Sequence, residues 1–107
     1  MLNSVIVVDD EASIRTAVEQ WLSLSGFSVQ LFARAEECLA QLPAHFPGVI
    51  ISDVRMPGMG GLQLLEQLHA QDPDLPVILL TGHGDVPMAG EAVRNGGYDF
   101  LEKPFTP

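Results

Sequence analysis

The stretch Val49-Ile50-Ile51-Ser52-Asp53-Val54-Arg55-Met56-Pro57 decides the fold of this chain. Its first four residues, three of them apolar and β-branched, are typical of a buried strand. The run leads directly into Asp53 and then into a proline-glycine loop. In open parallel sheets, ligands bind at the carboxyl ends of the strands, where loops rather than packed side chains surround them. Asp53 is therefore the candidate reactive group.

The segments on both sides of this stretch predict an alternation of strands and helices. Further strands are predicted at Val5–Val8, Phe27–Phe32, Val77–Thr81 and Tyr98–Leu101. Helices are predicted from Ile14 to Leu24, Ala35 to Leu42, Gly61 to Gln71 and Val86 to Asn95. Continuous apolar runs that alternate with helices favour a parallel sheet covered on both faces. With right-handed crossovers, the result is a doubly wound α/β fold.

The first two predicted helices each place apolar side chains toward the core. In the first helix this stripe consists of Ile14, Ala17, Val18, Trp21 and Leu24. Gly26 suits the position just beyond the carboxyl end of that helix. In the second helix, Cys38 is expected in the core.

Length and composition restrict the classes of function. A chain of 107 residues is expected to form one domain, spanning residues 1–107. Its 14 acidic and 5 basic residues give a net charge of −9, which disfavours direct contact with nucleic acid or an anionic membrane. A single cysteine cannot form an intrachain disulfide, so a cytoplasmic location is expected. No apolar run approaches the length needed to span a membrane.

Polar residues follow several of the predicted strands at their carboxyl ends. They are Asp9, Asp10, Asp53, Thr81 and Lys103. In a parallel sheet these ends lie on one edge, so the five side chains should converge. Carboxylates that lie close together repel one another unless a cation sits among them. Oxygen ligands favour a hard ion, Mg²⁺ (or Mn²⁺).

The chemistry that such a site favours is phosphoryl transfer to a carboxylate. A carboxylate nucleophile can form an acyl phosphate. The protein then has to position the groups in line and neutralise the charge on the phosphoryl oxygens. A cation and the ammonium group of Lys103 would neutralise that charge, and the Thr81 hydroxyl would hydrogen-bond one oxygen.

Four segments resemble the response-regulator receiver domains of two-component signalling. They are Val8-Asp9-Asp10-Glu11, Asp53-Val54-Arg55-Met56-Pro57-Gly58, Leu80-Thr81-Gly82-His83-Gly84 and Asp99-Phe100-Leu101-Glu102-Lys103-Pro104-Phe105. They extend over nearly the whole chain in the order of the family. The sequence around Thr81 and Phe100 resembles that of receivers of the NtrC type, particularly the dicarboxylate-transport regulators, with the FixJ type as the alternative.

The resemblance implies a fold and a role for each matching residue. The fold is flavodoxin-like (CheY-like), with a five-stranded parallel sheet in the order 2-1-3-4-5. Asp53 would be the phosphoacceptor, and Mg²⁺ would be bound by Asp9, Asp10, Asp53 and the backbone carbonyl of Arg55. Thr81 and Phe100 would form the switch pair, Lys103 would contact the phosphate, and Pro104 would follow a cis peptide bond.

The resemblance also implies partners. A sensor histidine kinase would donate the phosphoryl group, and the phosphorylated state would control a transcription-activating output carried elsewhere in the parent protein. The domain would form a homodimer and would not itself contact nucleic acid or a membrane. It would be a switch rather than an enzyme, apart from assisting its own phosphorylation and dephosphorylation.

Two departures from the family pattern affect these expectations. The chain ends at Pro107, before the fifth helix of the family, so we expect that helix to be missing, the domain to be truncated and apolar surface to be exposed. That surface would promote self-association or lower the stability. Gly90 and Gly97 would loosen the fourth predicted helix and its exit.

Other interpretations of the same residues remain open. A phosphatase with a carboxylate nucleophile also uses a strand-end aspartate, but it needs a second aspartate two residues later, where this chain has Arg55. A degenerate receiver that serves only for docking or dimerisation is the second alternative. Asp9 and Asp10 could simply cap the first helix, and Phe100 could be an ordinary core residue.

Overall fold

The computed structural model describes residues 3–82, 87, 90 and 99–102, the last four by the course of their backbone. The strands are β1 (Ser4–Val8), β2 (Ser28–Phe32), β3 (Val49–Asp53), β4 (Val77–Thr81) and β5 (Asp99–Glu102). The helices are α1 (Ala12–Leu24), α2 (Ala35–Gln41) and α3 (Gly61–Gln71). The helix predicted from Val86 to Asn95 lies largely outside the described residues, as does Gly97.

The strands form one five-stranded sheet in the order β2-β1-β3-β4-β5, with every neighbouring pair parallel. This confirms the predicted doubly wound topology. A chain that makes parallel neighbouring strands must cross back over the sheet between them, and helices provide the crossovers after β1, β2 and β3. The carboxyl ends of all the strands consequently point to the same edge.

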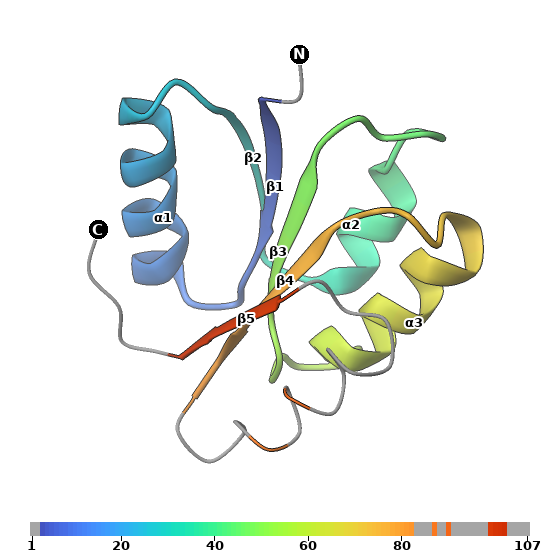
Figure 1. Cartoon of the computed structure of the whole chain (residues 1–107). Helices are drawn as coiled ribbons and strands as arrows, with labels where there is room; N and C mark the ends of the chain where they lie inside the picture. Colours follow the sequence, from blue (N-terminus) through green and yellow to red (C-terminus); the bar gives the residue numbers. More distant parts are fainter. Residues whose placement is uncertain (1–2, 83–86, 88–89, 91–98, 103–107) are drawn as a thin grey trace.

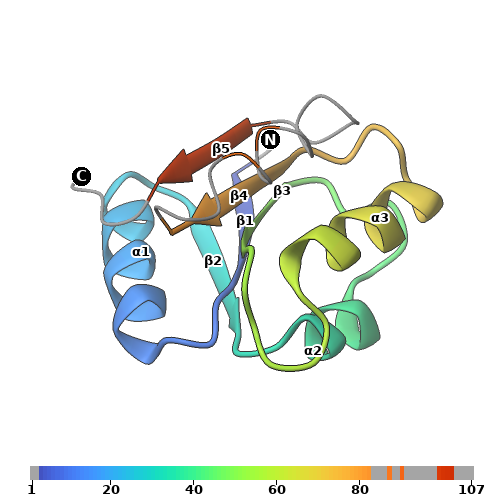
Figure 2. The same cartoon turned by 90° about the horizontal axis from the view of Figure 1, so that it is seen from below.

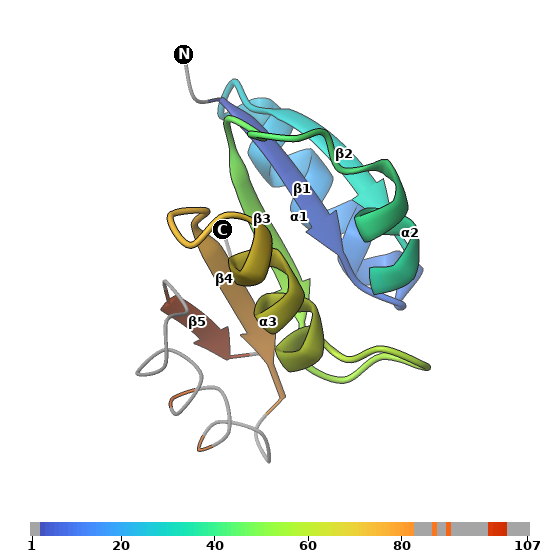
Figure 3. The same ribbon diagram turned by 90° about the vertical axis from the view of Figure 1, so that its right-hand side faces the viewer.

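Helices cover both faces of the sheet. Helix α1 lies on one face, while α2 and α3 lie side by side on the other (Figures 1 and 2). Seen from the side, α2 and α3 lie in front of the strands and α1 lies behind them (Figure 3).

The alternation of side chains along the strands divides the core between the two faces. Ile6 and Val8 of β1 pack in the larger core, under α2 and α3. Val5 and Val7 pack with Val18 in the smaller core, under α1. Cys38 is fully buried in the larger core, as predicted. Because β1 is buried on both faces, its sequence is an unbroken apolar run.

The inward stripe predicted for α1 is wrong at Ala17 and Leu24, which are both exposed. Leu24 is 89% exposed and Trp21 is only half-buried. The stripe that packs on the sheet is formed by the buried Val18 and the partly buried Ile14 and Leu22, which are spaced four residues apart. The row through Ala17 and Leu24 lies to one side of this stripe on the helix and faces away from the sheet.

The end of α1 agrees with the sequence. Gly26 has a positive φ of 91°, which glycine adopts without steric cost. Its N–H donates to the Ser23 carbonyl, and the N–H of Phe27 donates to the Leu22 carbonyl. These two bonds form a Schellman motif, which turns the chain back toward β2.

Of the helices within the described residues, none has the length and apolar character needed to cross a membrane.

Candidate functional site

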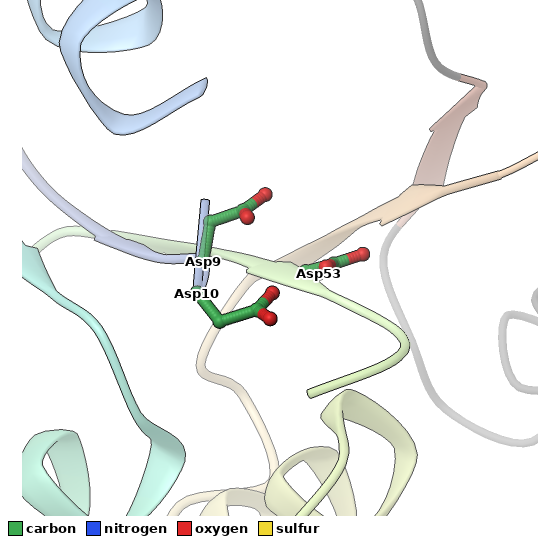
Figure 4. Close-up of side chains that lie close together, drawn as sticks. All are labelled: Asp9, Asp10 and Asp53. Atoms are coloured by element: carbon green, nitrogen blue, oxygen red, sulfur yellow. The ribbon is translucent and has the colours of Figure 1, made fainter. Parts of the chain in front are cut away.

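Three carboxylates meet at the carboxyl edge of the sheet (Figure 4). Asp9 and Asp10 directly follow β1, and Asp53 is the last residue of β3. Val8 pairs with Ser52 across the two neighbouring strands, so the residues that follow them lie side by side. Each of the three residues offers one carboxylate oxygen, and these oxygens all lie within 4.8 Å of one another. The predicted convergence of these three residues is therefore observed.

Burial of two of these carboxylates makes their negative charges unfavourable unless other groups compensate them. Asp9 is 0% exposed and Asp53 is 6% exposed, whereas Asp10 is exposed. Charged groups out of water require a compensating charge or hydrogen bonds. A set of oxygen donors with two buried carboxylates and an open side at Asp10 fits a hard divalent cation that keeps some of its water ligands.

Asp9 is held from two directions. Its Oδ1 accepts a hydrogen bond of 2.9 Å from the backbone N–H of Glu11, at the start of α1. Its backbone carbonyl accepts a hydrogen bond of 2.7 Å from the guanidinium of Arg15. Asp9 thus supports the start of α1 and belongs to the carboxylate cluster at the same time.

Arg15 was not singled out by the sequence. A signal was nevertheless present, since a cation near the amino-terminal end of a helix opposes the helix dipole and needs a specific partner.

Asp53 is fixed through its backbone. The N–H of Val54 donates to the Leu80 carbonyl at 3.0 Å, and the buried Ser52 hydroxyl donates to the Asp53 carbonyl at 3.0 Å. Helix α3 also begins against this point, because a Cβ at Gly61 would overlap the Asp53 carbonyl. The position of the carboxylate is therefore set by both the sheet and the helix that follows.

Thr81 lies at the expected end of β4. It is fully buried, and its hydroxyl donates to the Gly82 carbonyl at 3.0 Å. Asp53 pairs with Leu80, so Thr81 stands one residue further along the neighbouring strand. Across the next strand, Thr81 pairs with Glu102.

The remaining predicted site residues are described in part or not at all. The backbone of Phe100 pairs with Leu79 within the sheet, but its side chain is outside the described part of the chain. Lys103 and Pro104 lie outside the described residues, and so does His83.

The loop from β3 to α3 directly follows Asp53. Arg55 is exposed in this loop, and together with Met56 and Leu62 it lines an open surface pocket of about 580 Å³ beside the carboxylate cluster, whose three aspartates are not among the lining residues. The loop is also tied to α2, because the Glu36 carboxylate accepts a hydrogen bond of 3.2 Å from the Met59 N–H. The sequence had not singled out Glu36, since a glutamate in the first turn of a helix is already explained by the helix dipole.

Comparison with known proteins agrees with this arrangement. The family model for the response regulator receiver domain matches residues 5–107. The C4-dicarboxylate transport transcriptional regulatory protein DctD of Rhizobium meliloti is 56% identical over 102 residues, which is 95% of this chain and 22% of that protein. FixJ of Bradyrhizobium diazoefficiens is 46% identical over 101 residues, 94% of this chain and 49% of that protein. This chain spans about a fifth of the length of the DctD relatives.

Solved structures give the same result. The crystal structure of full-length FixJ from B. japonicum matches 97% of this chain and 51% of that chain, with a TM-score of 0.89 and 45% identity. The receiver domain of NtrX from Brucella abortus matches 95% of this chain and 87% of that chain, with a TM-score of 0.89 and 38% identity. By its fold, its carboxylate cluster and these similarities, the chain belongs to the response-regulator receiver domain family.

Proposed function

We propose that this receiver domain is a switch that is phosphorylated on Asp53. The observation that carries the proposal is the cluster of Asp9, Asp10 and Asp53, formed by the ends of two neighbouring strands. In the reaction, a carboxylate oxygen of Asp53 attacks the phosphorus of a phosphohistidine. The P–O bond of an acyl phosphate forms while the P–N bond breaks, and the histidine leaves.

Mg²⁺ (or Mn²⁺) is the cofactor of this proposal. Asp9, Asp10, Asp53 and the backbone carbonyl of Arg55 would hold it, and its charge would offset that of the phosphoryl oxygens. The tight packing around Asp9 and Asp53 keeps the two carboxylates in place before a donor arrives, which reduces the entropy cost of the reaction.

The remaining roles follow from the family pattern. Lys103 contacts the phosphoryl group, with Pro104 after a cis bond setting its direction. The Thr81 hydroxyl, which donates to Gly82 in the described state, turns to the phosphoryl oxygen. Phe100 then takes the space that Thr81 leaves. The phosphorylated state must be favoured by a few kcal/mol for such a switch to work.

The partners belong to the same proposal. The donor is a sensor histidine kinase in the cytoplasm, and the receiver, residues 1–107, acts within a longer transcriptional regulator. Similarity to DctD and NtrC regulators supports a transcriptional output. The domain itself forms a homodimer and does not contact nucleic acid or a membrane, in keeping with its net charge of −9.

Phosphoramidate tests the proposal because it offers the P–N bond of a phosphohistidine in a small molecule. We expect each chain to take up one phosphoryl group in the presence of Mg²⁺, after which incorporation should stop. Intact-mass spectrometry over time measures this incorporation. Continuous turnover of a phosphomonoester would instead indicate a phosphatase. A folded chain that takes up no phosphoryl group would indicate a docking module.

A further inference from the structure

Glu36 connects the second helix to the loop that follows Asp53. The residue lies in the first turn of α2, and its Oε2 accepts the hydrogen bond from the Met59 N–H. The two residues are 23 positions apart in the sequence, so this contact joins two separate elements.

The carboxylate also packs against the backbone at the tip of this loop. Gly58 has a φ of 75°, and a Cβ built there would lie 2.5 Å from Glu36 Oε2. The positive φ favours glycine at this position, and the short distance shows that the Glu36 carboxylate lies directly against the loop backbone. The contact therefore involves two successive residues of the loop, Gly58 and Met59.

The base of the same loop is closed by the sheet and by α3. The Gly61 N–H donates to the Val54 carbonyl at 2.9 Å, and the Val54 N–H donates to Leu80 of β4. The residues between these points project outward from the sheet edge. Arg55 belongs to this part of the loop, so the position of its backbone depends on how the tip is held.

We propose that Glu36 is a positioning residue for the metal site: its carboxylate holds the β3–α3 loop in the shape from which the Arg55 carbonyl reaches the cation. This inference rests on the proposed function, because it takes the metal site as given. It adds a residue that lies outside the carboxylate cluster and does not itself bind the ion.

The charge state of Glu36 fits this role. Its pKa lies below the ordinary value because the backbone N–H of Glu36 and that of Met59 hydrogen-bond to the carboxylate, with Arg34 nearby. The carboxylate is therefore ionised at neutral pH, where it accepts hydrogen bonds more strongly than a neutral group.

A simpler explanation is that Glu36 only stabilises the amino-terminal turn of α2. Glu37 provides a matched control, since it is also exposed and also acidic in the same turn. Substitution of either residue by alanine removes the same charge from the same turn. Only Glu36 is hydrogen-bonded to Met59.

The test compares Glu36→Ala, Glu36→Gln and Glu37→Ala in the whole chain without any phosphoryl donor. Hydrogen exchange of the Met59 amide, measured by NMR, reports the hydrogen bond. Titration calorimetry with Mg²⁺ reports the metal site. We expect Glu36→Ala to speed exchange at Met59 and to weaken Mg²⁺ binding roughly threefold, as suits the loss of one exposed hydrogen bond. Glu36→Gln keeps an acceptor oxygen but loses the charge, so its Met59 exchange rate and its Mg²⁺ affinity should lie between those of wild type and Glu36→Ala.

Two results would overturn the inference while leaving the proposed function intact. The first is an unchanged Mg²⁺ affinity in Glu36→Ala. The second is an equal loss of affinity in Glu37→Ala, which would indicate a general effect of charge. A wild-type chain that binds no Mg²⁺ would instead contradict the proposed function, and the role of Glu36 with it.

Discussion

Asp9 and Asp10 are neighbours in the sequence but have different surroundings. Asp9 is buried and hydrogen-bonded to the start of α1, whereas Asp10 is exposed. Their contributions to metal binding and to stability should therefore differ. The adjacent pair could be recognised from the sequence, but this division of roles depends on the packing of α1 against β1.

The substitution Asp10→Asn should weaken Mg²⁺ binding without lowering the stability of the metal-free chain. Because Mg²⁺ is divalent, a unit charge about 4 Å from it contributes about 2 kcal/mol in water and more near the protein surface, so the affinity should fall at least tenfold. Removing one of three mutually repelling carboxylates should leave the free energy of unfolding unchanged or slightly higher. Calorimetry and urea unfolding with a chelator measure the two quantities.

The exposed Asp74 provides a control for Asp10→Asn, because it lies in the loop between α3 and β4, away from the cluster. Asp74→Asn removes the same charge and should leave the Mg²⁺ affinity unchanged. If Asp10→Asn also left it unchanged, Asp10 would not be a ligand.

Cys38 gives the domain a dependence of stability on alkaline pH. Burial raises the pKa of its thiol from 9.0 to about 11, since the core disfavours the thiolate. The unfolded chain therefore loses this proton at a lower pH than the folded chain. The resulting contribution to stability is fully present below pH 9 and is lost as the pH rises toward 11.

We expect this loss to amount to roughly 2 kcal/mol between those two pH values. Urea unfolding of wild type and Cys38→Ala at a series of pH values measures it, and the difference between the two curves isolates the thiol from other groups that titrate in this range. If the free energies of unfolding of the two proteins changed with pH in parallel, Cys38 would not contribute to the pH dependence of stability. The buried position could be predicted from the helical spacing, but the pKa shift requires the packed core.

At the level of elements, the close contact between the start of α3 and the end of β3 matters most for the site. Gly61 leaves no room for a Cβ beside the Asp53 carbonyl. Sequence reasoning placed a helix boundary at Gly61 but gave no reason for a glycine there. The reason is the approach of two backbones, which no local pattern reveals.

Gly61→Ala should force α3 away from β3 and lower the free energy of unfolding by about 1 to 3 kcal/mol, the usual range for overpacking. Urea unfolding measures this effect. Gln67→Ala, at an exposed position of the same helix, serves as the control and should change stability little. Equal stability of Gly61→Ala and wild type would show that the contact is not tight.

The strands were easier to predict than the side of α1 that faces the sheet. Val5–Val8 and Val77–Leu80 carry side chains that are buried or partly buried on both faces, so their sequences are continuous apolar runs. In α1, Leu24 and Val18 are both apolar, and only the packing direction of the helix decides which is buried. A buried stripe that is predicted from the spacing of apolar residues alone can therefore lie on the wrong side of the helix by one row of side chains.

For the whole molecule, the parallel topology is what creates the site. It places the carboxyl ends of β1 and β3 side by side, so residues 44 positions apart form one cluster. That result could be predicted from the sequence because only the order of elements and the rule for parallel strands were needed. The hydrogen bond between Glu36 and Met59 could not be predicted from the sequence, because it depends on the shape of a loop.

The central claim is that Asp53 accepts a phosphoryl group at this edge of the sheet. The most direct measurement incubates the chain and its Asp53→Asn variant with acetyl phosphate, each with Mg²⁺ and with a chelator, and determines the intact masses. We predict one phosphoryl group on the wild-type chain with Mg²⁺, and none on the variant or in the presence of the chelator. Equal incorporation into Asp53→Asn, or no incorporation into the folded wild-type chain, would contradict the claim.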